Sequence, residues 1–205
     1  MTRVVLASRN AHKVLEVARI LADADLGIDL VGIDDLAVEG SFGVIPDVAE
    51  TEASFAGNAL LKARSLAAHT GLMAISDDSG LCVDALNGMP GILSARWSGK
   101  HGDDDANLRL VLDQLVDTPT ERRGAFFVCA AAVVTPNGVE RVVEGRLDGW
   151  LTTERRGAHG FGYDPVFVPD GETRTTAEMA PAEKDAISHR GRAFRGLAPH
   201  VAELA

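Results

Sequence analysis

Two adjacent carboxylates, Asp77 and Asp78, lie inside the apolar run Ile75–Val83 and are followed at once by Ser79 and Gly80. Burying a negative charge is costly unless a cation or a hydrogen-bonding partner compensates it. Asp-Asp-Ser-Gly at the end of a buried strand therefore predicts a place where a cation is held. Asp, Ser and Gly are also turn formers, so a polar turn without chemistry stays open as the alternative.

A second segment with chemical potential follows the first apolar run of the chain. It consists of Ser8, Arg9, Asn10, Ala11, His12 and Lys13. Free backbone N–H groups at a strand-to-helix junction attract anions, and Lys13 would add a positive charge in the first helical turn, which suits a phosphate chain. The segment is not a Walker A loop, because its glycines and Gly-Lys-Ser/Thr are missing. An ordinary capped helix with solvated basic side chains remains the alternative.

Glu50 lies in a polar loop before a strongly predicted helix that carries Asn58 and Lys62. These residues form a further candidate site, whose chemistry the local pattern does not specify. A solvated acidic loop beside an exposed lysine would give the same pattern.

Two late segments could recognise a flat ligand. Gly160 and Gly162 flank Phe161 and allow a backbone to approach closely, while the aromatic ring could stack on a base. The donor-rich segment contributes Lys184, Ser188, His189, Arg190 and Arg192. Side chains that donate without accepting suit carbonyl and phosphate oxygens. A glycine-rich turn and a solvated basic helix end are the corresponding alternatives.

The elements that must position these residues follow from hydrophobic periodicity. Strands are predicted at 4–7, 30–33, 72–75, 125–134, 139–143 and 166–168, and helices at 54–68, 104–115 and 191–205. A further helix is predicted after the first strand, with Val14, Val17, Ala18 and Leu21 on its apolar face. Asn10 is expected to cap the first helix, Gly71 to end the second and Pro136-Asn137-Gly138 to form a hairpin turn. Helices alternate with strands early and a hairpin comes late, which predicts an α/β fold with a mixed sheet in one domain, residues 1–205.

The composition excludes several classes of protein. The formal net charge is −10, which argues against general nucleic-acid binding. Cys82 and Cys129 lie in apolar runs outside any Cys-x-x-Cys, so both are expected to be buried, reduced thiols. No apolar stretch approaches the roughly 20 residues that span a bilayer, and no signal-peptide pattern is present. These patterns predict a cytoplasmic protein without a membrane partner.

Taken together, the segments resemble one family in the order in which they occur. S-x-N-x-x-K, then E-T and N-A-x-x-K-A, then D-D-S-G-L, F-G-Y-D-P and E-K-x-x-x-S-H-R-G are similar to the HAM1/RdgB family of inosine/xanthosine triphosphate pyrophosphatases. The resemblance runs from Val4 to about Leu197. It implies an ITPase-like α/β fold: a mixed sheet with flanking helices and two lobes around a central nucleotide-binding cleft. It also implies a homodimer and a purine nucleoside triphosphate as small-molecule partner.

The resemblance assigns roles residue by residue. Glu50 and Asp78 match Mg²⁺-binding acids, and Asp78 also matches the proton acceptor for the attacking water. Asp77 is implied to support the metal site through water. The implied substrate contacts are Ser8, Arg9, Asn10, Ala11, His12, Lys13, Lys62, Ser79, Phe161, Gly162, Tyr163, Asp164, Lys184, His189 and Arg190. Arg9 occupies a variable position, so no role is implied for its side chain.

The implied reaction converts ITP, dITP or XTP to the monophosphate and pyrophosphate. His189 and Arg190, as donors, would favour a 6-oxo purine over adenine, whereas exclusion of the guanine 2-amino group has no assigned residue. Two other functions stay open: a non-catalytic purine-nucleotide-binding regulatory module, and a phosphatase that releases inorganic phosphate. A serine hydrolase is discounted because the chain lacks a Gly-x-Ser-x-Gly elbow.

Overall fold

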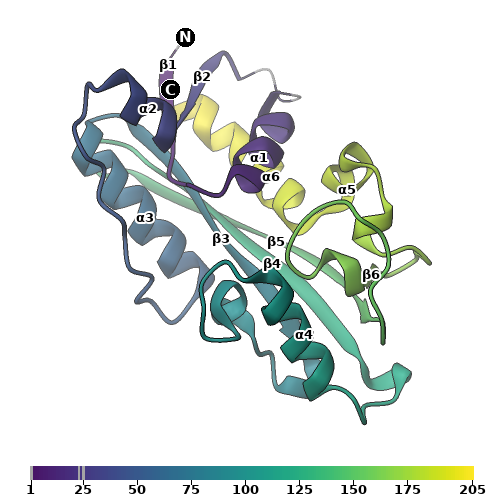
Figure 1. Ribbon diagram of the computed structural model, residues 1–205. Helices are drawn as coiled ribbons and strands as arrows, with labels where there is room; N and C mark the ends of the chain where they lie inside the picture. The colour runs from purple at the N-terminus through teal and green to yellow at the C-terminus, as the bar shows by residue number, and fades with distance from the viewer. Residues whose placement is uncertain (1, 23, 25) are drawn as a thin grey trace. The chain divides into compact units, whose positions relative to one another are not determined.

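The computed structural model describes residues 2–22, 24 and 26–205. They form two compact units (Figure 1). The first comprises the described residues of Met1–Asp78 together with Cys129–Gly145 and Arg190–Ala205. The second comprises Ser79–Val128 and Arg146–His189. Three of the four boundaries between the units fall within strands of the sheet, and the fourth falls between His189 and Arg190 at the start of the last helix.

The described strands form a mixed six-stranded sheet in the order β2-β1-β3-β4-β5-β6. Their bounds are β1 Thr2–Leu6, β2 Ile28–Gly32, β3 Met73–Val83, β4 Gly124–Val134, β5 Glu140–Leu151 and β6 Phe167–Pro169. β1 is parallel to β2 and β3, whereas β5 is antiparallel to β6. The predicted mixed α/β architecture with flanking helices is therefore confirmed.

In the first unit, alternating side chains of the strands pack against helices on two faces of the sheet. Val4, Leu6 and Ile75 point into a core shared with α1 (Ala11–Ala22) and α6 (His189–Leu204). Val5 and Ala74 point the other way, into a core shared with α2 (Ile33–Glu39) and α3 (Phe55–Thr70). This alternation decides where the polar residues that follow in β3 point.

The second unit has its own core between strands and α4 (Asp104–Gln114). Leu108 and Val111 of that helix pack with Val83, Phe127 and Phe167. The unit also contains α5 (Pro181–Ile187) and the short 3-10 helices η1 Asp84–Leu86, η2 Gly91–Arg96, η3 Thr120–Arg122, η4 Asp164–Val166 and η5 Thr176–Glu178.

Several predicted helix ends are confirmed. The Asn10 side chain accepts a hydrogen bond from the Lys13 N–H (3.1 Å), as expected of a cap. Ser54 caps α3 by accepting from Gly57, and Gly71 ends it with a positive φ of 67°. α2 was not predicted, because its seven residues are too few to establish a helical period.

A buried strand over the run that contains Asp77 and Asp78 is confirmed, whereas a strand end or a polar turn at this motif is wrong. β3 continues without interruption from Met73 to Val83 and carries both carboxylates in its middle. None of the helices in the described part of the chain is long and apolar enough to cross a membrane.

Candidate active site

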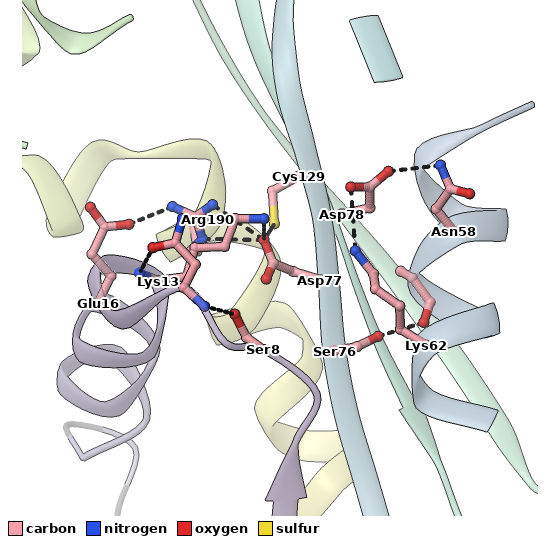
Figure 2. A network of polar contacts seen from close by, with 12 residues as sticks. Ser8, Lys13, Glu16, Asn58, Lys62, Ser76, Asp77, Asp78, Cys129 and Arg190 are labelled. Atoms are coloured by element: carbon pink, nitrogen blue, oxygen red, sulfur yellow. Dashed lines mark hydrogen bonds and ion pairs between the residues drawn. The ribbon is translucent and has the colours of Figure 1, made fainter. Parts of the chain in front are cut away.

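The register of the parallel strands brings the Ser8–Lys13 segment beside the acidic pair. Leu6 of β1 is paired with Ile75 of β3, and the Ala7 N–H donates to the Ile75 carbonyl (2.8 Å). The chain leaves β1 at this level, next to the residues that follow Ile75. Successive side chains of a strand point to opposite faces, so Asp77 and Asp78 diverge (Figure 2).

Asp78 points toward α3, where two side chains contact its carboxylate and one of them, Lys62, also binds Glu50. Lys62 lies with its Nζ 2.8 Å from Glu50 Oε1 and 3.4 Å from Asp78 Oδ1. Asn58, one helical turn before Lys62, donates from Nδ2 to Asp78 Oδ2 (3.1 Å). Its Oδ1 accepts from the Glu52 N–H (3.0 Å), which ties the Glu50 loop to the same helix. Two side chains of α3, Asn58 and Lys62, thus bring Asp78 and the loop that contains Glu50 together.

Burial and charge act in opposite directions on these groups. Burial raises the pKa of Asp78, and nearby Glu50 raises it further, while Lys62, Lys13 and Asn58 oppose the change without cancelling it. Burial alone would lower the pKa of Lys62, but Asp78, Asp77 and Glu50 outweigh it, so the pKa rises. Lys62 therefore stays protonated, and Asp78 becomes a stronger base than an ordinary aspartate.

The donor set fits Mg²⁺. Glu50 and Asp78 converge on one ammonium group, which shows that their oxygens can face a single cation. Mg²⁺ in proteins is usually held by one or two carboxylates together with substrate phosphates rather than by a complete protein cage. Among the described residues, no group of three or more His, Cys, Asp or Glu side chains is arranged as a metal site. Glu50 and Asp78 would hold the ion.

Asp77 points to the opposite face, toward α1 and α6. Its Oδ2 lies 3.3 Å from Lys13 Nζ and 3.2 Å from Arg190 Nη2, and it also accepts from Arg190 Nε (3.3 Å). Arg190 Nη1 pairs in turn with Glu16 of α1. The thiol of Cys129 lies 3.7 Å from the same Asp77 oxygen. These buried groups connect β3, α1, β4 and α6 (Figure 2).

Asp77 pairs with two cations that the sequence did not connect to it. Burial would raise the pKa of Asp77, but Lys13, Arg190 and Lys62 hold it well below its usual value. Asp77 is therefore ionised and fixes two cations on the α1–α6 face; its support of a metal through water stays a prediction. Arg190 is buried, and its Nε, Nη1 and Nη2 donate to Asp77 and Glu16.

The start of α1 exposes several of the predicted phosphate contacts. Asn10, Ala11 and His12 are exposed, and Ser8 accepts through Oγ from the Asn10 N–H (3.2 Å). Arg9 turns toward the loop before Glu50, donating to the Ile45 carbonyl (2.7 Å) and to Asp47 (2.8 Å). The exposed turn fits an anion at a helix N-terminus.

In the second unit, the predicted base-binding segment is organised around Asp164. Its buried carboxylate accepts from the Phe161 N–H (2.9 Å) and from Thr176 Oγ1 (2.8 Å), and it pairs with Lys184 Nζ (2.6 Å). The same ammonium lies 5.1 Å from the centre of the Phe161 ring. Asp164 thus fixes both the aromatic residue and the lysine that the sequence singled out.

The remaining predicted contacts of the second unit are also placed. Tyr163 is buried and donates through its hydroxyl to the Ser94 carbonyl (2.9 Å). His189 is buried and stacks on Phe127 with ring centres 4.7 Å apart. Ser79 follows Asp78 directly in β3 and is partly buried.

Sequence reasoning brought forward most of these residues but missed Glu16. The signal was available: Glu16 lies on the same face of α1 as Lys13, in a helix whose other buried residues are apolar. A buried acid on an apolar face requires a cationic partner. Its partner, Arg190, is 174 positions away, which no local pattern reveals.

Fold and site define a class: an α/β protein whose first unit combines an exposed helix N-terminus with two carboxylates that converge on one cation. The chain belongs to the Ham1 family, because the family model matches residues 4–200.

Comparison with individual proteins agrees. A Streptomyces coelicolor protein named dITP/XTP pyrophosphatase is 60% identical over 204 residues, covering 100% of this chain and 99% of its own. A crystal structure titled nucleoside-triphosphatase, dITP/XTP pyrophosphatase, from Mycobacterium abscessus is 55% identical, with a TM-score of 0.76 over 97% of this chain and 100% of that chain. A HAM1 protein from Coxiella burnetii is 38% identical, with a TM-score of 0.85 over 99% of this chain and 100% of that chain.

Proposed function

We propose that this protein hydrolyses the deaminated purine nucleoside triphosphates dITP, ITP and XTP to the monophosphate and pyrophosphate. The observation that carries the proposal is the convergence of Glu50 and Asp78 on one ammonium group, in a chain whose relatives are named dITP/XTP pyrophosphatase. The proposed cofactor is Mg²⁺, held by Glu50 and Asp78. When bound, it supplies a Lewis acid that polarises phosphate oxygens and lowers the pKa of a water.

The residues of the first unit then have separate tasks. Asp78, whose pKa burial raises, accepts a proton from the attacking water. The water oxygen forms a bond to the α-phosphorus, and the bond from that phosphorus to the α–β bridging oxygen breaks. Lys13 and Lys62 stabilise the negative charge that accumulates on the departing pyrophosphate. Ser8 and the exposed N–H groups at the start of α1 hold the phosphate chain.

The residues of the second unit are proposed to recognise the base. Phe161 stacks on the purine, and Lys184 and His189 supply donors to the 6-oxo group of hypoxanthine or xanthine. Adenine presents a 6-amino donor instead, and a buried donor left unpaired costs about 1–3 kcal/mol. Arg190 already donates to Asp77 and Glu16. We therefore propose that Arg190 contributes by fixing the start of α6, immediately after His189.

The deciding experiment is a panel of ITP, dITP, XTP, GTP and ATP with Mg²⁺, in which pyrophosphate and inorganic phosphate are both measured. Preference for the first three substrates with pyrophosphate as product is expected. Release of inorganic phosphate alone would indicate a phosphatase instead. The Asp78→Asn variant should bind nucleotide but lose turnover, and near-normal turnover in this variant would show that Asp78 is not the base. Binding of nucleotide without any turnover in the wild-type protein would favour a regulatory module.

Assembly and location complete the proposal. The family resemblance supports a homodimer, which light scattering after size-exclusion chromatography tests. The buried free cysteines Cys82 and Cys129 support a reducing compartment, so we propose the cytoplasm. Cell fractionation with an antibody against the protein tests that location.

A further inference from the structure

The segment that carries Phe161 has a backbone that side-chain sterics alone do not fix. Gly160 and Gly162 flank the aromatic residue with φ values of 74° and 60°, in the left-handed region that glycine adopts freely. Gly162 has no neighbouring atom where a Cβ would lie. On the other side of Phe161, a Cβ at Gly160 would collide with the Asp164 side chain, so that side is packed. Because the Gly162 side is open, hydrogen bonds to the turn contribute to where the ring lies.

Two carboxylates accept hydrogen bonds from consecutive backbone N–H groups of this turn. The Phe161 N–H donates to Asp164, three residues later in the same turn. The Gly162 N–H donates to Asp104 Oδ2 (2.9 Å), which belongs to α4 and lies 58 positions earlier in the sequence. Asp164 shapes the turn locally, whereas Asp104 attaches the turn to a helix packed in the core of the second unit.

Asp104 is not needed to cap its own helix. The residue before it, Asp103, occupies the cap position and accepts from the Ala106 N–H (3.3 Å). The carboxylate of Asp104 is also close enough to Tyr163 to raise the pKa of that phenol further, after the larger effect of burial. The Asp104 carboxylate therefore acts on two residues that follow Phe161. It accepts a hydrogen bond from Gly162, and its charge affects the phenol of Tyr163.

We propose that Asp104 is a positioning residue for base recognition, which holds Phe161 in place through the Gly162 N–H. The inference rests on the proposed function and adds a determinant of nucleotide affinity outside the segments that the sequence singled out. Its action is on binding of the purine, because Asp104 contacts the turn that carries the ring and none of the groups assigned to the phosphates.

The test compares Asp104→Ala with Asp104→Asn, which keeps an oxygen acceptor. The matched control is Asp103→Ala, which removes the helix cap and the exposed ion pair with Lys100 but leaves the acceptor of the Gly162 N–H in place. KM and kcat for ITP and the Kd of inosine monophosphate by calorimetry are measured for each. Asp104→Ala should raise KM and Kd about 10-fold, the scale of one lost hydrogen bond to a charged group, with kcat within about threefold. Asp104→Asn should recover most of the affinity, and Asp103→Ala should keep it while lowering Tm.

Three results would overturn the inference: unchanged KM and Kd in Asp104→Ala, an equal loss of affinity in Asp103→Ala, or a loss confined to kcat. If Asp104→Ala does not fold, exchange of the Gly162 amide decides, because an unprotected amide in the wild type excludes the hydrogen bond. Calorimetry with inosine monophosphate does not depend on turnover. A wild-type protein that binds the monophosphate but hydrolyses no triphosphate would refute the proposed hydrolysis, and the effect of Asp104 on affinity could still be measured. A wild type that binds no monophosphate would overturn the inference.

Discussion

Chemically identical substitutions at the neighbouring residues Asp77 and Asp78 should have different effects on stability. Asp77 is buried and balances Lys13 and Arg190, so Asp77→Asn leaves two cations without their shared anion. Breaking a buried ion pair from one side typically costs about 3–5 kcal/mol. Asp78→Asn removes a charge that burial disfavours, so we expect stability to be unchanged or slightly higher.

Urea unfolding followed by circular dichroism provides the assay. With a slope of about 2 kcal/mol per molar urea, Asp77→Asn should lower the midpoint by roughly 1.5–2.5 M. The midpoint of Asp78→Asn should stay at or above that of the wild type. Equal destabilisation by the two single substitutions would refute the separation of the carboxylates onto two faces.

Other consequences can be checked directly. Removal of divalent cations with EDTA should abolish pyrophosphate release, and added Mg²⁺ should restore it. Asn58→Ala should raise the Mg²⁺ concentration needed for half-maximal rate, because the Glu52 N–H and Asp78 lose their shared partner. Burial, and then Asp77, raise the pKa of the Cys129 thiol, so iodoacetamide should modify it in urea but not in the native protein. The Ala180 N–H and Arg174 lower the pKa of Glu183; its contribution to stability should be present above about pH 4.5 and disappear as pH falls, which carboxyl NMR shifts during acid titration can follow.

The fold was largely predictable because its signals are local. Apolar periodicity predicted α3 within two residues of its observed ends, and Ser54 and Gly71 mark those ends chemically. The predicted hairpin after β4 is present, with the Thr135 N–H donating to the Val139 carbonyl (2.9 Å). These elements depend on neighbours in the sequence, which is the range over which propensity and capping act.

The site was predictable in its residues but not in its pairings. Asp-Asp-Ser-Gly carries strong turn propensity, yet β3 continues through it because partners on both faces compensate the buried charges. Those partners are remote: Arg190 lies 113 positions from Asp77. Tertiary contacts of this range override local propensity, and a single sequence contains no periodic signal for them.

The opposite orientation of Asp77 and Asp78 limits how this sequence can change. A deletion or insertion of one residue in β3 before Asp77 would keep both aspartates in the sequence. It would nevertheless turn every following side chain to the opposite face of the sheet. A substitution at Asp77 or Asp78 affects the contacts on one face of the strand only. A shift of one residue would instead remove Asp77 from the cations between α1 and α6 and Asp78 from Lys62 and Asn58 at the same time. We therefore expect natural variation in β3 to occur by replacement, with its length unchanged.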